Sequence, residues 1–178
     1  MSLLDNRFSI YTINSNYLNY LHQYDDRVPT EHDETFAKKR PFIGIIVVVD
    51  GLNYVLPLTS PKKKHLTMRN ALDFQKIDNG NLGAINLNNM FPITNMPLTH
   101  EMIDISNDSE LNNSQRDYTK LIKEQLIWLN RTENRDKILA KAISLRRSYI
   151  NNTLPTKIRN RCCNFALLEE KCNEYIPK

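Results

Sequence analysis

The chain has 178 residues, 40% of them hydrophobic and 25% charged, with a net charge of +4, four glycines and eight prolines. This composition is typical of one folded domain and excludes a repeat array, a fibre and a disordered tail. The longest apolar run, Phe42 to Val49, has the length of a strand, so the sequence predicts neither a transmembrane helix nor a signal peptide and favours a cytoplasmic protein.

Charge is distributed unevenly along the chain. The net charge is −4 over residues 1–35, +6 over 36–69, −5 over 70–117 and +7 over 118–178. Two basic blocks separated in sequence could meet in one positive surface, whose natural partner is a polyanion, most often nucleic acid. The alternative is that these lysines and arginines only solvate exposed faces, and the charge pattern leaves both interpretations open.

The N-terminal part of the chain predicts a strand, a helix and a loop, in that order. Phe8 to Ile13 alternates and is rich in β-forming residues. Ser15 is placed to cap a following helix, whose apolar residues recur at spacings of three and four and which ends near residues 25–26. Val28 to Lys39 contains turn formers and charges without a period, which indicates a loop.

A β-hairpin is the strongest structural signal. The β-branched run 42–49 is followed by Asp50-Gly51, a pair that accepts the positive φ angles of a tight turn, and Tyr54 to Leu58 returns as the partner strand. Thr59 to His65 then leaves the sheet as a polar loop that carries hydroxyls, cations and an imidazole. Functional groups are commonly placed on such loops by a rigid sheet.

The rest of the chain completes an α+β pattern. Strands are predicted at 74–77 and 83–87, around an Asn79-Gly80 turn, and at 90–93, before an irregular acidic stretch over 97–117. Helical periodicity then appears at 115–131, with Gln125 on its apolar face, at 134–150 and, after a basic loop over 151–161, at 165–175. We predict one α+β domain with helices packed on a curved, mainly antiparallel sheet.

The loop after the hairpin is the best candidate site. Thr59 and Ser60 can donate hydrogen bonds to phosphate oxygens, and Lys62 can stabilise the negative charge that develops on a five-coordinate phosphorus. If the substrate is RNA, its own 2′-hydroxyl is the nucleophile, and no metal is needed. The competing interpretation is a solvated basic loop beside Pro61.

Other types of site find little support in the sequence. The three cysteines, with Cys162 and Cys163 adjacent, suit a reducing compartment better than a disulfide framework, and the four histidines are scattered. The sequence contains no glycine-rich phosphate loop, zinc-ligand spacing or dinucleotide fingerprint. We therefore expect neither a metal nor a cofactor.

Several segments, taken in order, resemble the toxins of type III toxin–antitoxin systems, the ToxN/AbiQ family. These segments are Tyr11-Thr12-Ile13 with Tyr17 and Tyr20, residues 25–29, residues 41–45, Leu58-Thr59-Ser60-Pro61-Lys62-Lys63 with His65, residues 82–87 and residues 163–171. The resemblance runs from about residue 8 to residue 175. Residues 1–7 look like an N-terminal extension of a single domain over 8–178.

The resemblance implies a metal-independent endoribonuclease with a twisted, partly barrel-like antiparallel sheet, similar to the Kid and MazF toxins. Family members cut adenine-rich RNA and leave 2′,3′-cyclic phosphate and 5′-hydroxyl ends. A small repeated RNA that folds as a pseudoknot holds them inactive in closed protein–RNA assemblies. Their targets are cellular and phage RNA, and the outcome includes abortive infection by phage.

Carried over to this chain, the resemblance implies that Thr59, Ser60 and Lys62 are catalytic. Tyr17 corresponds to a family tyrosine near the site, and Phe36 stands where relatives can have a tyrosine. The remaining candidates for binding RNA are Lys38, Lys39, Arg40, Lys63, Lys64, His65, Arg146 and Arg147. The alternative functions are a non-catalytic RNA-binding module and, with no carboxylate cluster to support it, a metal-dependent nuclease.

Overall fold

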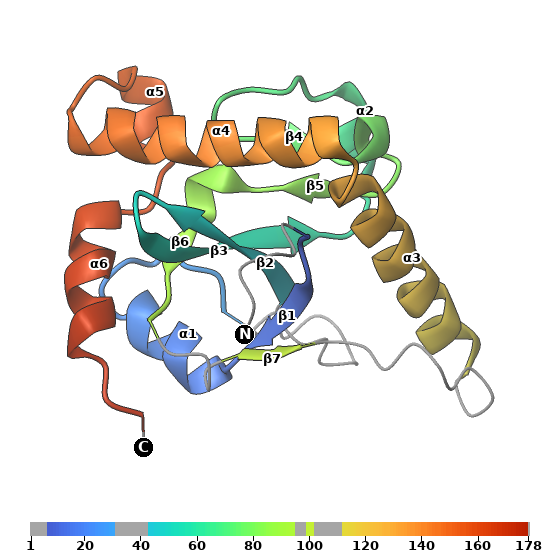
Figure 1. Cartoon of the computed structure of the whole chain (residues 1–178), viewed down its shortest axis with the longest axis horizontal. Helices are drawn as coiled ribbons and strands as arrows, with labels where there is room; N and C mark the ends of the chain where they lie inside the picture. The colour runs from blue at the N-terminus through green and yellow to red at the C-terminus, as the bar shows by residue number, and fades with distance from the viewer. Residues whose placement is uncertain (1–6, 31–42, 95–98, 102–111, 178) are drawn as a thin grey trace.

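One antiparallel sheet forms the centre of the protein (Figure 1). The computed structural model describes residues 7–30, 43–94, 99–101 and 112–177. The strands within these residues are β1 (Ile10–Ile13), β2 (Ile43–Val49), β3 (Leu52–Thr59), β4 (Gln75–Lys76), β5 (Ala84–Ile85), β6 (Phe91–Pro92) and β7 (Thr99–Glu101). They lie in the order β4-β5-β3-β2-β1-β7, and β6 pairs with β3 outside this row.

The sheet is open, because its row of strands ends at β4 on one side and at β7 on the other. The α+β class and the antiparallel pairing are confirmed, whereas the expected closure toward a barrel is not observed. Every strand pair among the described residues is antiparallel. The fold is therefore an open sheet that depends on its helices for cover.

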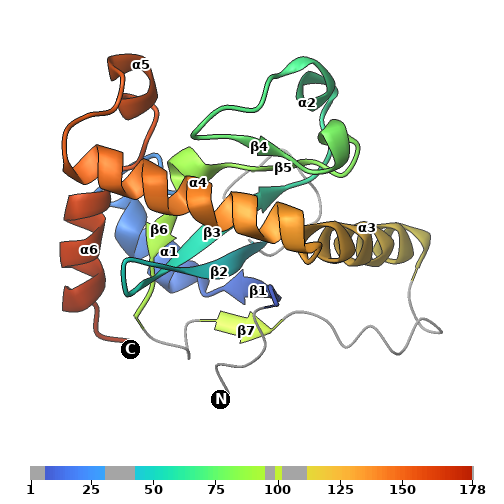
Figure 2. The same ribbon diagram turned by 45° about the horizontal axis from the view of Figure 1, so that its top comes forward.

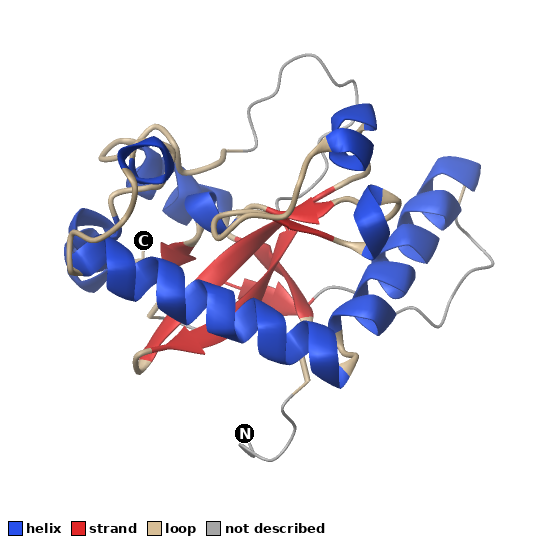
Figure 3. Ribbon diagram, turned by 90° about the horizontal axis from the view of Figure 1, so that it is seen from above, coloured by secondary structure: helices blue, strands red, loops and turns tan. Residues whose placement is uncertain are grey.

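Helices surround the sheet. They are α1 (Ser15–His22), α2 (Lys63–Thr67), α3 (Asn113–Leu129), α4 (Thr132–Ile150), α5 (Thr156–Arg159) and α6 (Phe165–Glu174), with short 3₁₀ turns η1 (Asp78–Gly80) and η2 (Leu87–Asn89). In Figure 1, α4 runs above the sheet and α1 lies below it, beside α6. Figure 3, seen from above, shows α4 crossing the strands while α3 projects from one of its ends. None of the helices in the described ranges is both long and apolar enough to cross a membrane.

The predicted hairpin is confirmed, and its two strands lie in the middle of the sheet. β2 pairs with β3 from Val49 opposite Leu52 to Gly44 opposite Pro57. Asp50 and Gly51 connect them with φ angles of 51° and 83°. These positive angles match the twist of the two strands, which is why an Asp-Gly pair serves as the turn.

The apolar faces predicted from helical periodicity are buried. On α4, the residues Ile138, Ala142, Leu145 and Tyr149 all lie in the core. On α6, Phe165, Leu168 and Cys172 do the same. All three cysteines are free and buried.

Several boundaries differ from the prediction. Asn14, not Ser15, caps α1, because its side-chain oxygen reaches the backbone N–H of Asn16 and of Tyr17. The strands expected at 74–77 and 83–87 shorten to two residues each, since the chain between them makes a wide turn. The basic loop over 151–161 contains α5, which starts directly after Pro155, and β7 lies in the stretch expected to be irregular.

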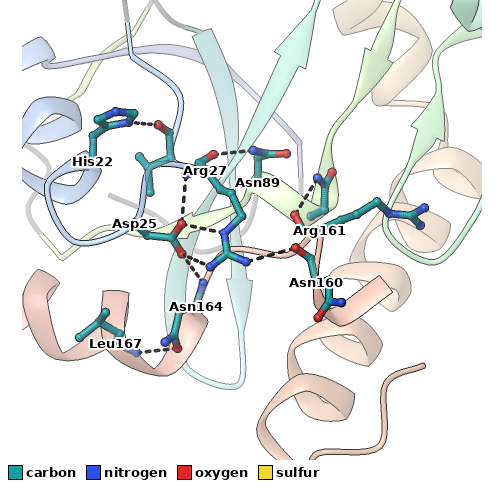
Figure 4. Close-up of polar contacts among 10 residues, drawn as sticks. His22, Asp25, Arg27, Asn89, Asn160, Arg161, Asn164 and Leu167 are labelled. Carbon is teal, nitrogen blue, oxygen red and sulfur yellow. Dashed lines mark hydrogen bonds and ion pairs between the residues drawn. The ribbon is translucent and has the colours of Figure 1, made fainter. Parts of the chain in front are cut away.

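A network around Asp25 connects the segment after α1 to the C-terminal part of the chain (Figure 4). The carboxylate of Asp25 accepts hydrogen bonds from Arg27 Nε at 2.8 Å and from the backbone N–H of Asn164 at 2.6 Å. Asn164 in turn caps α6 through the backbone N–H of Leu167. Burial alone would raise the pKa of Asp25, but these hydrogen bonds and the Arg27 charge lower it.

Replacing Asp25 should therefore destabilise the fold. We expect Asp25→Asn to reduce the free energy of unfolding by about 1–3 kcal/mol, because the new amide nitrogen would face N–H donors. The exposed neighbour provides the control: Asp26→Asn should change stability by less than about 0.5 kcal/mol. Urea unfolding of both variants measures the difference, and equal stabilities would contradict this account of the network.

Candidate active site

The hydroxyl and lysine residues of the predicted site lie where β3 ends. Thr59 is the last residue of β3, Ser60 and Pro61 leave the sheet, and Lys62 immediately precedes α2. Figure 2 shows α2, β4 and β5 together at this end of the sheet. The polar loop predicted over Thr59 to His65 is thus shorter than expected, because its second half is already helical. Thr59 and Ser60 are half-buried and Lys62 is exposed.

The turn over residues 78–83 packs directly against this segment. Asp78, Asn79, Gly80 and Gly83 all have positive φ angles. A Cβ atom on Gly83 would lie 1.9 Å from the carbonyl oxygen of Thr59, and one on Gly80 would lie 2.6 Å from the carbonyl oxygen of His65. Both contacts are closer than any side chain permits, so this turn requires glycine at the two positions. The Thr59 hydroxyl also donates to the Ala84 carbonyl at 3.3 Å.

His65 points into the protein. It is 2% exposed, its ring lies 5.9 Å from that of Phe74, and its Nδ1 accepts a hydrogen bond from the backbone N–H of Lys62 at 3.3 Å. Burial, followed by the charges of Lys64 and Lys62, lowers the pKa of His65 from its ordinary value of 6.5. The neutral ring therefore holds Lys62 at the start of α2. The His65 ring is not at the surface in this structure, and its direct contact with RNA stays a prediction.

Gln125 of α3 contacts both this segment and the 78–83 turn. Its Nε2 donates to the Leu82 carbonyl at 2.7 Å and to the Thr59 carbonyl at 3.4 Å, and the residue is 1% exposed. The sequence placed Gln125 on the apolar face of this helix without assigning it a role. The signal in the sequence that could have indicated a role was a polar amide at a position of that face where the other buried residues, Ile122 and Leu129, are apolar.

The site combines two hydroxyls and an exposed ammonium on a backbone that neighbouring elements hold in place. Such a group suits an anion with several oxygens, above all a phosphate. Within the described ranges, no three His, Cys, Asp or Glu side chains gather closely enough to hold a metal ion.

Tyr17 is a core residue. It is fully buried, and its hydroxyl donates to the Pro92 carbonyl at 2.7 Å and contacts Cys172 Sγ at 3.0 Å. Its ring packs edge-on against Tyr175 at 4.9 Å. Burial raises the pKa of the Tyr17 hydroxyl, which therefore remains a donor. Tyr17 therefore does not reach the surface in this structure, and its contact with RNA stays a prediction.

Arg146 and Arg147 lie at the other end of the hairpin. Arg146 pairs with Glu169 at 2.7 Å and with Asp50 at 3.0 Å, and Arg147 pairs with Asp50 at 2.6 Å. Since β3 separates Asp50 from Thr59, the distance to the candidate site is on the order of 20 Å. The guanidinium of Arg146 is committed to these two carboxylates, while Arg147 keeps 63% of its side chain exposed.

The remaining candidates divide into two groups. Lys63 and Lys64 are exposed on α2, next to Lys62. Phe36, Lys38, Lys39 and Arg40 lie outside the described residues.

Adding a methyl group at Gly83 should displace the segment that carries Thr59. We expect Gly83→Ala to lower the free energy of unfolding by about 3 kcal/mol or more, because the methyl overlaps the Thr59 carbonyl and φ is +98°. Gly51→Ala is the control, since its φ is +83° but nothing lies within 4 Å of the added methyl, so it should lose only about 1–2 kcal/mol. Chemical denaturation compares the two, and similar losses would mean that the contact is unimportant.

Protonation of His65 should weaken the fold. Because the folded-state pKa lies below 6.5, the unfolded chain binds more protons between these two values, and stability falls as pH drops through 6.5. Protonated Nδ1 also ceases to accept the Lys62 N–H. His65→Gln keeps an acceptor at this helix position without titrating. We expect the melting temperature of the original protein to fall more between pH 7.5 and 5.5 than that of the variant; parallel profiles would contradict the assignment.

Comparison with known proteins places the chain in a defined group. The family model described as toxin ToxN of type III toxin–antitoxin systems matches residues 9–173. An endoribonuclease ToxN of Pectobacterium atrosepticum is 36% identical over 171 residues, which cover 93% of this chain and 92% of that protein. An endoribonuclease ToxN of Bacillus thuringiensis subsp. kurstaki is 29% identical, over 93% of this chain and 82% of that protein.

Solved structures share the fold. One concerns a processed non-coding RNA that regulates a bacterial antiviral system; it has a TM-score of 0.73 and 31% identity, covering 95% of this chain and 99% of that chain. Another concerns selective toxin inhibition by a non-coding RNA pseudoknot, with a TM-score of 0.71 and 28% identity, covering 95% and 98%. On these matches and on the extent of the family model, the chain belongs to the ToxN family of type III toxin–antitoxin toxins.

Proposed function

We propose that this chain is an endoribonuclease toxin that cuts adenine-rich RNA without a metal ion or cofactor. The observation that carries the proposal is the surface group of Thr59, Ser60 and Lys62, held on a backbone that the 78–83 turn and Gln125 fix from two sides. Membership of the ToxN family adds support, since the relatives compared above are named endoribonucleases.

The chemistry that suits these groups is transesterification within the RNA. The 2′-oxygen attacks the adjacent phosphorus and loses its proton, the bond to the 5′-oxygen breaks, and that oxygen takes up a proton as it leaves. The products are a 2′,3′-cyclic phosphate and a 5′-hydroxyl. Negative charge grows on the non-bridging oxygens at the five-coordinate stage, and the Lys62 ammonium stabilises it there.

The two hydroxyls position the phosphate. The Thr59 hydroxyl makes a long hydrogen bond of 3.3 Å to the Ala84 carbonyl, which it can exchange for a phosphate oxygen at little cost. Ser60 is the next residue and lies in the same half-buried segment. His65 takes no proton from the RNA in this scheme; it holds the backbone of Lys62 instead.

An RNA antitoxin is the proposed partner. Relatives have structures concerned with inhibition or regulation by non-coding RNA. We extend this to a small antitoxin with pseudoknot repeats that binds this chain in a closed protein–RNA assembly. The phosphate-binding groups of the site, with exposed Lys63 and Lys64, serve inhibitor and substrate alike. The substrates are cellular and phage RNA in the cytoplasm, and the biological outcome is abortive infection.

The role of Lys62 provides the test. We expect Lys62→Ala to lower the rate of RNA cleavage by at least about 10²-fold, the size typical of losing one group that stabilises developing charge, while the folded structure persists. Lys120→Ala, which removes an exposed lysine on α3, is the control and should cleave normally. The assay uses protein freed of nucleic acid, an adenine-rich RNA and a chelator, with analysis of the product ends.

Each alternative function has its own outcome in this assay. Cyclic phosphate ends formed in the presence of chelator support the proposal. Activity that disappears with the chelator and returns with magnesium would favour a metal-dependent nuclease. RNA that stays intact but shifts in a gel would instead favour a binding module without catalysis. An unchanged rate in Lys62→Ala would remove this lysine from the mechanism.

A further inference from the structure

We propose that Gln125 is a positioning residue that sets the orientation of the Thr59–Ser60 peptide, and that the rate of RNA cleavage depends on it. The inference rests on the proposed function for its kinetic consequence. Its structural part stands on contacts alone. Gln125 belongs to α3, which begins more than fifty residues after Thr59 in the chain, and it meets the site from the side opposite the solvent.

The direction of the Gln125 side-chain amide is fixed by its partners. Its Nε2 donates to the carbonyls of Leu82 and Thr59, at 2.7 and 3.4 Å. Rotating the amide by half a turn would set Oε1 against two carbonyl oxygens, which repel it. Gln125 thus connects the 78–83 turn to the end of β3 through one pair of hydrogens.

The other half of the amide has no partner. Among the described residues, all other buried side-chain nitrogen and oxygen atoms make hydrogen bonds, whereas Gln125 Oε1 makes none. A buried acceptor left in this state destabilises the fold, because it has given up its hydrogen bonds to water. Ile122 and Leu129, on the same face of α3, are apolar, and packing alone would favour an apolar residue at 125 as well. The hydrogen bonds that Nε2 donates therefore account for an amide, in place of an apolar side chain, at position 125.

The Thr59 carbonyl is held from two directions. Gly83 approaches so closely that a Cβ atom would lie 1.9 Å from the oxygen. Gln125 makes a long contact of 3.4 Å to the same oxygen, and its short hydrogen bond of 2.7 Å to the Leu82 carbonyl keeps its amide beside that oxygen. The carbonyl of Thr59 and the N–H of Ser60 belong to one planar peptide. Fixing the carbonyl therefore also fixes the direction of the Ser60 N–H and the starting point of the Ser60 side chain. A small rotation of this peptide would misplace both hydroxyls relative to the phosphate.

Gln125→Met tests the inference, because methionine has a similar volume and cannot donate. We expect kcat to fall by about 10–100-fold while KM stays within about twofold, since displacement of catalytic groups by a fraction of an ångström is enough for such a loss. The matched control is Ile122→Val on the same buried face, which removes one methyl group from the core and lowers stability modestly. It should leave kcat unchanged.

A second measurement is independent of cleavage. Amide hydrogen exchange at Thr59, Ser60 and Lys62 should accelerate at least about tenfold in Gln125→Met and stay unchanged in Ile122→Val. Unchanged exchange in Gln125→Met would overturn the inference even if the protein cleaves RNA. An equal fall of kcat in both variants would likewise reduce Gln125 to a packing residue. If exchange accelerates in Gln125→Met but the original protein cleaves no RNA, the positioning contact is retained and the proposed function is rejected.

Discussion

The close approach of Gly83 to the Thr59 carbonyl is the constraint on which the candidate site depends. Two backbones meet there with no room for even one methyl group between them. The contact is possible because the 78–83 turn adopts positive φ angles at four positions. The same turn brings Gly80 against His65 and presents the Leu82 carbonyl to Gln125. Contacts with this one irregular turn thus fix the positions of Thr59, Ser60 and the start of α2.

Charge is organised differently at the two ends of the hairpin. Near Asp50, arginines and carboxylates are paired: Arg146 with Glu169, and both Arg146 and Arg147 with Asp50. At the other end, none of the ion pairs found among the described residues involves Lys62, Lys63 or Lys64. Among the described residues, positive charge without an ion-pair partner therefore lies beside the two hydroxyls of the candidate site.

This arrangement also explains why the two basic blocks of the sequence are not equivalent. The C-terminal block contributes Arg161 to a pair with Asp73 and Arg146 to a pair with Glu169, so part of its charge serves the fold. The block around Lys62 keeps its lysines exposed. A count of charges along the chain cannot separate these cases, because the acidic partners are distant in sequence.

The sequence predicts the parts of the fold that depend on local signals. Asp50-Gly51 specifies a hairpin within two residues, and the apolar positions of α4 and α6 follow from helical spacing. The sequence also predicts that the catalytic candidates follow the second strand of the hairpin, at the end of β3. The contacts that shape the site were not: Gln125 lies 43 residues from Leu82 and 66 from Thr59. The inward direction of Tyr17 and His65 also depends on packing across the chain.

Several locally unfavourable features lie at this end of the molecule, although positive φ angles also occur at Asp50 and Asn152 elsewhere in the chain. They include the positive φ angles of Asp78 and Asn79, a neutral imidazole beside lysines and the unpaired oxygen of Gln125. Around Asp25, by contrast, each buried charge has its partners. Strain and unpaired polar groups persist where a precise arrangement has a use, and here they lie beside the backbone of the candidate site.

Such a rigid segment has a consequence for inhibition by RNA. In the proposed function, substrate and antitoxin offer the same phosphates, so the lysines at the site would attract both, and the attraction would weaken with salt for both. Charge alone cannot distinguish an RNA that is cut from one that is bound intact. The distinction must arise where the 2′-oxygen, the phosphorus and the leaving oxygen align with Thr59, Ser60 and Lys62. Under the proposed function, a fixed Thr59–Ser60 peptide would make that alignment a property of the bound RNA, and a folded RNA could then occupy the site without being cleaved.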